Sequence, residues 1–191
     1  MGDNARGALE RLVAGNRRFA EGRPSQRFAA AEREASAGAQ RPFATVIGCS
    51  DSRVPVEVVF DAGVGELFVV RTAGHTLAQA SLASIRFAVE KLGTPLVLVL
   101  GHEDCGAVSA ALAGDAPEWL EPITSRIEIS AIDPARAPAD AEDPLLAAAV
   151  DEHVRDTVAE LRAFVATFAP DTLVAGAAYK LASGEVHWLE D

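Results

Sequence analysis

Two short polar clusters carry side chains of the types that bind metal ions. The first contains Cys49, Asp51 and Arg53, and the second contains His102 and Cys105. Two thiolates and one imidazole form a ligand set that suits zinc better than magnesium or calcium. Tetrahedral zinc takes a fourth ligand, which is water at a catalytic site or Asp51 at a closed one. The residue types therefore predict a zinc site held by the two cysteines and the histidine.

The Asp–Arg pair of the first cluster needs a role beyond metal ligation. Asp51 and Arg53 stand two residues apart, so they can form a bidentate ion pair that keeps the carboxylate ionised and away from the metal. Such a carboxylate could accept a hydrogen bond from a metal-bound water and orient it. The alternative is a purely structural ion pair at a strand end.

Other interpretations of the cysteines stay open on the residues alone. A single cysteine after a strand is most often a small buried hydrophobic residue. A thiol or redox enzyme would instead use Cys49 or Cys105 as a nucleophile with a lowered pKa. The zinc interpretation is favoured because both cysteines stand beside acidic, basic or imidazole groups, which are rare neighbours in a plain core.

Three apolar, β-prone runs predict the strands that place these clusters, and they cover residues 43–48, 66–70 and 95–100. The first run ends at Cys49, and the third stops just before His102. In open parallel sheets, ligands bind beyond the carboxyl ends of the strands. Both clusters are therefore directed toward one crevice.

Helical patterns alternate with these strands, which is typical of an α/β fold. Helices are expected over 3–20, 28–38, 77–92, 107–113 and 145–168. The remaining tail indicates two strands around a turn at Ser183 and Gly184. The pattern predicts a mostly parallel central β-sheet flanked by helices, with an N-terminal helical arm over 1–38 and a C-terminal hairpin.

Length and composition fit one domain spanning residues 1–191 and exclude several classes of protein. The 17 basic and 28 acidic side chains give a net charge of −11, which argues against binding to nucleic acid or to anionic membranes. No apolar run approaches the roughly 20 residues that span a bilayer. Two cysteines 56 residues apart fit neither a disulfide framework nor a CxxC pair. A soluble, cytoplasmic protein is expected.

The segment 115–144 differs in kind from the rest of the chain. It holds five of the ten prolines, and its eight acidic residues outnumber its two arginines. We expect an exposed, partly irregular excursion that carries −6 of the net charge and has no assigned role.

The motifs of the chain resemble those of the β-class carbonic anhydrases. The resemblance rests on Cys49-Ser-Asp-Ser-Arg53 followed by His102-x-x-Cys105-Gly. It extends over most of the chain through Gly15-Asn-Arg-Arg-Phe19, Gln40-Arg-Pro, Arg71-Thr-Ala-Gly74, and Tyr179 with Ser183-Gly184. It implies the family fold and a homodimer or homotetramer. In that assembly the N-terminal helix embraces the partner, which would cover the apolar face of residues 3–20.

The resemblance also implies an activity, namely zinc-dependent reversible hydration of carbon dioxide to bicarbonate and a proton. One Zn²⁺ per chain would be held by Cys49, His102 and Cys105, and Asp51 with Arg53 would form the catalytic dyad that orients the water. The implied substrate-binding residues are Gln40, Phe68 and Gly106. Zinc would lower the pKa of its water from near 16 toward about 7, so that hydroxide attacks carbon dioxide. Because two thiolates neutralise the metal's charge, activity should rise toward alkaline pH.

Some positions depart from the family pattern. His75 and His153 stand where asparagine is common, and each is a candidate proton shuttle, although a histidine on the surface or one that supports the metal ligands is favoured. Arg71 and Tyr179 match two members of a trio that holds regulatory bicarbonate in one branch of the family. Val46 stands where that trio has tryptophan, which argues against regulation of that type.

Two further functions compete with carbon dioxide hydration. Relatives on the same scaffold hydrolyse carbonyl sulfide or carbon disulfide, but the intact Cys-Ser-Asp-Ser-Arg motif and Gln40 favour carbon dioxide. A closed zinc site with Asp51 as the fourth ligand would serve structure or regulation without catalysis.

Overall fold

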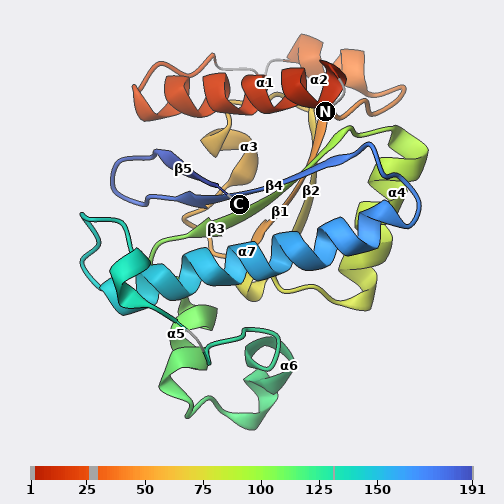
Figure 1. The fold of residues 1–191 in the computed structure, drawn as a ribbon. Coiled ribbons are helices and arrows are strands. Elements are labelled where there is room, and N and C mark those ends of the chain that lie inside the picture. Colours follow the sequence, from red (N-terminus) through yellow and green to blue (C-terminus); the bar gives the residue numbers. More distant parts are fainter. Residues whose placement is uncertain (1–2, 26–29, 131, 191) are drawn as a thin grey trace.

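The computed structural model describes residues 3–25, 30–130 and 132–190, and its centre is a five-stranded sheet (Figure 1). The strands are β1 Ala44–Cys49, β2 Leu67–Thr72, β3 Leu96–His102, β4 Leu173–Tyr179 and β5 Val186–Leu189. Their order is β2-β1-β3-β4-β5, with β5 antiparallel to β4 and all other neighbours parallel. The predicted parallel sheet with a C-terminal hairpin is confirmed.

The helices follow the predicted pattern to within a few residues. They are α1 Asp3–Ala20, α2 Ala30–Ser36, α3 Val56–Val59, α4 Gln79–Leu92, α5 Gly106–Ala113, α6 Glu121–Thr124 and α7 Pro144–Ala166. The side chain of Asp143 caps α7 by accepting the N–H groups of Leu145 and Leu146. Gly93 ends α4 with a left-handed φ of 71°. The four-residue helix α3 carries too short a pattern to be predicted.

The helices cover both faces of the sheet (Figure 1). Alternate side chains of β3 point to opposite faces, as the pleat of a strand requires. Leu96, Leu98 and Leu100 pack with residues of α1 and α3, whereas Val97 and Val99 pack with residues of α4 and α7. Each face therefore has its own apolar layer, and β3 is buried along its whole length.

Helix α1 packs with one side against its own chain. Its buried stripe, which includes Ala8 and Leu12, lies against the sheet of its own chain. Gly15 allows this close approach, because a Cβ there would lie 1.9 Å from the Phe60 carbonyl oxygen. Asn16 fixes the contact by donating to the carbonyl of Gly184 and accepting the N–H of Val186. The chain itself thus covers part of this apolar face, whereas Val13 on the same helix is 44% exposed. Coverage of the helix by a partner stays a prediction.

In its described residues before α7, the segment 115–144 is mostly exposed, and its helices are short turns, including α6. One side chain departs from that description. Ile127 is 5% exposed and belongs to the apolar cluster that contains Cys49 and Cys105. The segment therefore contributes to the surroundings of the two sulfurs.

None of the helices in the described ranges is both long enough and apolar enough to cross a membrane.

Candidate metal centre

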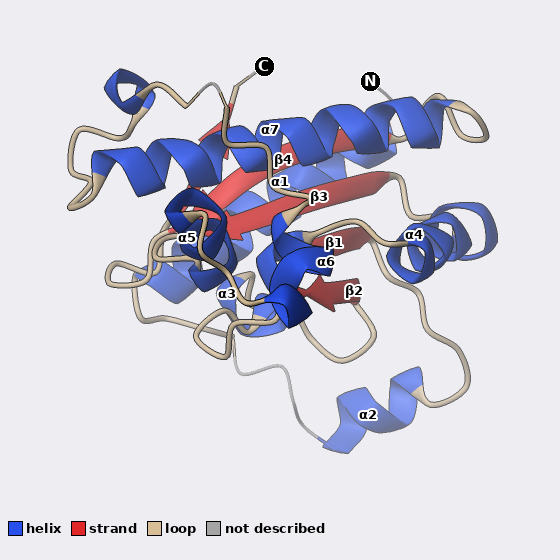
Figure 2. Ribbon diagram, turned by 90° about the horizontal axis from the view of Figure 1, so that it is seen from below, coloured by secondary structure: helices blue, strands red, loops and turns tan. Residues whose placement is uncertain are grey.

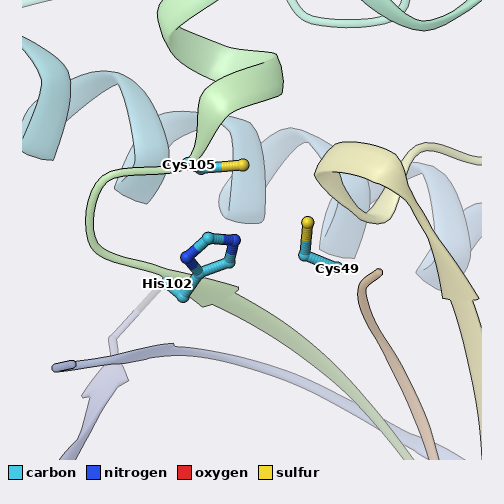
Figure 3. A group of neighbouring side chains, drawn as sticks. All are labelled: Cys49, His102 and Cys105. Carbon is cyan, nitrogen blue, oxygen red and sulfur yellow. The ribbon is translucent and has the colours of Figure 1, made fainter. Parts of the chain in front are cut away.

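Strands β1 and β3 are neighbours in the sheet (Figure 2), and three side chains meet at the carboxyl edge that these strands form (Figure 3). Cys49 is the last residue of β1, His102 is the last residue of β3, and Cys105 directly precedes α5. One ligand atom from each lies within 4.8 Å of the other two, and all three side chains are buried. Within the described part of the chain, this is the one group of three or more potential ligands that converges in this way. The sequence prediction that these residues come together is confirmed.

The imidazole of His102 presents a free lone pair to the two sulfurs. Its Nδ1 lies 2.7 Å from the carbonyl oxygen of Glu103, which can only accept, so Nδ1 carries the proton. The unprotonated Nε2 is buried and has no hydrogen-bond partner among the residues that the structure describes. A buried acceptor without a partner is costly unless it binds something else. This tautomer is the one that a metal-ligating histidine with a backbone partner adopts.

The tight turn between His102 and Cys105 depends on Asp104. Asp104 has a φ of 52°, a left-handed conformation that aspartate tolerates better than most residues. The turn is tied to both sides of the site. The Glu103 carboxylate accepts the N–H of Leu181 at 2.9 Å, and the Arg53 guanidinium donates to the Asp104 carbonyl at 3.2 Å.

The pKa values of the two thiols are shifted in opposite directions. The hydrogen bond with Cys105 lowers the pKa of Cys49 far below its ordinary value, and the N–H groups of Asp51 and Gly74 lower it further against the effect of burial. The same hydrogen bond, together with burial, raises the pKa of Cys105. Cys49 is therefore the thiol that ionises first, which prepares the site for a cation.

Asp51 and Arg53 form the bidentate pair that their spacing allows. Arg53 Nε donates to Oδ1 of Asp51 at 3.0 Å, and its terminal nitrogen donates to Oδ2 at 2.8 Å. The backbone N–H of Arg53 also donates to Oδ1 at 2.8 Å. The carboxylate stands outside the converging Cys-His-Cys group. In this arrangement Asp51 is held by arginine and does not take a ligand position.

The sequence motifs include Arg71 but do not reveal its role in shaping the loop after β1. Arg71 donates to the carbonyl oxygens of Cys49 at 2.9 Å and of Asp51 at 2.6 Å. Arg71 and Tyr179 lie on β2 and β4, with β1 and β3 between them. Val46 is fully buried in the sheet. Arg71 thus supports the site through the backbone, a role that no sequence motif specifies.

The predicted substrate-binding residues take two different places. Gly106 begins α5 next to Cys105, at the site. Gln40 is exposed and precedes β1, so the length of that strand, about 20 Å, separates it from Cys49. Phe68 lies near the start of β2, opposite Thr45, and its ring contacts Phe87 with a centroid separation of 6.3 Å. The role of Gln40 and Phe68 stays a prediction, because one chain does not bring them to the metal ligands.

Gly74 joins the site to α5 and cannot be replaced without strain. Its φ is +59°, and a Cβ at this position would lie 2.9 Å from the Cβ of Ala107. We expect Gly74→Ala to destabilise the fold by about 1–3 kcal/mol in urea denaturation, because the new methyl group adds backbone strain to a steric clash. Gly38→Ala is the control, since Gly38 has open space around it. Equal stability of the two variants would contradict this prediction.

Comparison with known proteins gives one consistent result. A protein-family model described as carbonic anhydrase matches residues 44–186. A carbonic anhydrase of Mycolicibacterium smegmatis is 42% identical over 190 residues, covering 94% of this chain and 90% of that protein. The β-carbonic anhydrase CafA of Aspergillus fumigatus superposes with a TM-score of 0.73 at 24% identity, over 98% of this chain and 91% of that one. A tetrameric β-carbonic anhydrase of Sordaria macrospora superposes with a TM-score of 0.70 at 20% identity, over 97% and 98% of the two chains.

Proposed function

Since the chain belongs to the carbonic anhydrase family, we propose that it catalyses the reversible hydration of carbon dioxide to bicarbonate and a proton, with one zinc ion held by Cys49, His102 and Cys105. The observation that carries this proposal is the convergence of three buried ligands beside an Asp–Arg pair that stays out of the ligand group. Zinc bound there supplies Lewis acidity that lowers the pKa of water.

Side-chain and backbone groups of the protein itself have separate roles in the proposed reaction. The Asp51 carboxylate, held by Arg53 through both of its oxygens, accepts a hydrogen bond from the reacting water and so fixes the direction of the water's lone pair. The N–H of Gly106, at the start of α5, is available to an oxygen of the substrate, because the first N–H groups of a helix have no partner within it. Ile127 keeps apolar surface next to the two sulfurs. Arg53, which is half exposed, offers a cationic path for the bicarbonate product.

The ion pair also fixes the protonation state of Asp51. The hydrogen bond from Arg53 lowers the pKa of this carboxyl to about 2, whereas an unfolded chain has a value of about 3.9. Because the folded pKa is the lower one, the pair stabilises the fold above about pH 4, and this contribution disappears as the pH falls toward 2. We expect the ¹³C signal of the Asp51 carboxyl to titrate near pH 2 and to titrate higher in Arg53→Gln. A wild-type midpoint near 4 would contradict the ion pair in solution.

Stopped-flow hydration of carbon dioxide with a pH indicator, at about pH 7 and again near 8.5, tests the proposed function in zinc-loaded protein. We expect activity at both pH values and more at the higher one, because two thiolates weaken the acidification of water. If the zinc-bound protein shows no activity at either pH, the proposed activity fails and the closed, non-catalytic zinc site is the hypothesis that remains. Turnover of carbonyl sulfide or carbon disulfide alone would point to the related hydrolases. Zinc far below one atom per chain would remove both zinc hypotheses.

The positions of Gln40 and Phe68 support an oligomer as part of the proposal. Neither residue reaches the ligands of its own chain, so a substrate contact by either requires a second copy. Strand β2 lies at the edge of the sheet, and its side chains are only partly buried. We propose a homodimer or homotetramer in the cytoplasm, where free cysteines stay reduced. Light scattering coupled to gel filtration tests the assembly, and a monomer at micromolar concentration would remove the proposed contacts of Gln40 and Phe68.

A further inference from the structure

Two histidines outside the ligand group form a buried stack behind the site. The rings of His75 and His153 have centroids 4.3 Å apart and planes at 28°, and their side chains are 1% and 2% exposed. Burial lowers the pKa of both imidazoles. Neutral rings enclosed in this way are poor proton shuttles, because a shuttle must titrate near the working pH and exchange protons with solvent. The pair therefore calls for another role.

His153 is connected to a proposed metal ligand through a single residue. Its Nε2 lies 2.8 Å from the carbonyl oxygen of Gly74, and because that oxygen only accepts, Nε2 is the protonated nitrogen. The N–H of the same Gly74 donates to the sulfur of Cys49 at 3.3 Å. A continuous path of contacts thus runs from α7 through Gly74 to the sulfur.

The segment that carries this path is strained. Gly74 and His75 have φ values of 59° and 44°, and both lie in the left-handed region. For His75 this conformation is unfavourable, and such residues persist when their surroundings hold them in place. Thr76 holds one end of the turn through its hydroxyl, which donates to the Ala73 carbonyl. The imidazole of His153 holds the middle of the turn at Gly74.

We propose that His153 is a positioning residue for the metal centre. By donating Nε2–H to the Gly74 carbonyl, it keeps the Gly74 N–H on the Cys49 sulfur and thereby sets how strongly that sulfur binds a metal. Hydrogen bonds to ligand atoms tune metal sites in this way, and losing such a partner typically costs 10–100-fold in metal affinity. This inference rests on the proposed function only in taking Cys49 as a metal ligand.

Two substitutions at one position separate hydrogen bonding from packing. His153→Phe keeps an aromatic ring for the stack with His75 but has no N–H to donate. His153→Gln places an amide N–H near the position of Nε2. Thr157→Val serves as the control on α7, because it removes the buried hydrogen bond from Thr157 to the His153 carbonyl and leaves the contact with Gly74 in place.

We expect zinc transfer from full-length His153→Phe to a chromophoric chelator to be about 10–100-fold faster than from wild type. In the cobalt-substituted protein, the thiolate-to-cobalt charge-transfer band should move to lower energy, because the sulfur has lost an N–H donor. His153→Gln and Thr157→Val should stay close to wild type in both measurements. Wild-type behaviour of His153→Phe, or equal changes in all three variants, would overturn the proposal.

Hydrogen exchange of the metal-free protein tests this inference independently of the proposed function. The Gly74 amide proton of the metal-free protein should exchange with solvent more slowly in wild type and His153→Gln than in His153→Phe. If this difference appears and carbon dioxide is not hydrated, the positioning role stands and the proposed activity fails. If all three proteins exchange at the same rate, the positioning role fails, whatever the activity.

Discussion

Asp51→Ala should hydrate carbon dioxide at least ~100-fold more slowly than wild type while it retains one zinc ion per chain. The magnitude, about 100-fold, is that expected when a reacting group loses its orientation. The rate should fall without loss of zinc, because Asp51 is held by Arg53 and stands outside the Cys-His-Cys group. Stopped-flow kinetics and metal analysis on the same preparation measure both quantities.

Asp115→Ala is the matched control for this variant. It removes the same charge from an exposed position after α5 and should leave both readouts unchanged. Loss of zinc from Asp51→Ala would show that Asp51 is a ligand of a closed site. Unchanged turnover would remove Asp51 from the proposed mechanism.

Cys105→Ser should lose most of its zinc, to less than about a tenth of an atom per chain after dialysis, and should lose its activity with it. Serine has nearly the same size as cysteine, but its hydroxyl stays protonated at neutral pH and does not replace a buried thiolate as a zinc ligand. Metal analysis after dialysis against a weak chelator measures the first effect, and stopped-flow kinetics measures the second.

Ser109→Ala, one helical turn further along α5 and exposed, is the control for local changes in that helix. It should bind zinc like wild type. Circular dichroism of both variants separates loss of metal from loss of fold. A folded Cys105→Ser protein with one zinc per chain would contradict the assignment of Cys105 as a ligand.

The carboxyl edge of the sheet could be predicted because its determinants are local. The apolar runs of β1 and β3 end beside Cys49 and His102, and parallel pairing alone brings those two ends together. The turn from His102 to Cys105 then places the third ligand within three residues. The spacing of Asp51 and Arg53 likewise specifies their ion pair without any distant contact.

Other features depend on contacts between segments far apart in the chain, and the sequence could not specify them. Arg71 binds backbone carbonyls, which every residue possesses, so no side-chain pattern marks its partners. The stack of His75 on His153 joins positions 78 residues apart, through a turn with left-handed φ values. Ile127 is one of several apolar residues in an acidic segment, and only the packing of that segment shows that it borders the sulfurs.

The proposed ligands come from the end of β1 and from the end of β3 with the turn that follows it, and this arrangement has a thermodynamic consequence. Cys49 and Cys105 stand 56 positions apart, and the residues between them include β2, α4 and all of β3. A metal that binds both sulfurs acts as a cross-link around this loop. A covalent link of that loop length lowers the conformational entropy of the unfolded chain by an amount worth about 4 kcal/mol at 25 °C. Occupancy of the site would then raise the unfolding temperature, so the same ion would serve both the proposed reaction and the stability of the fold.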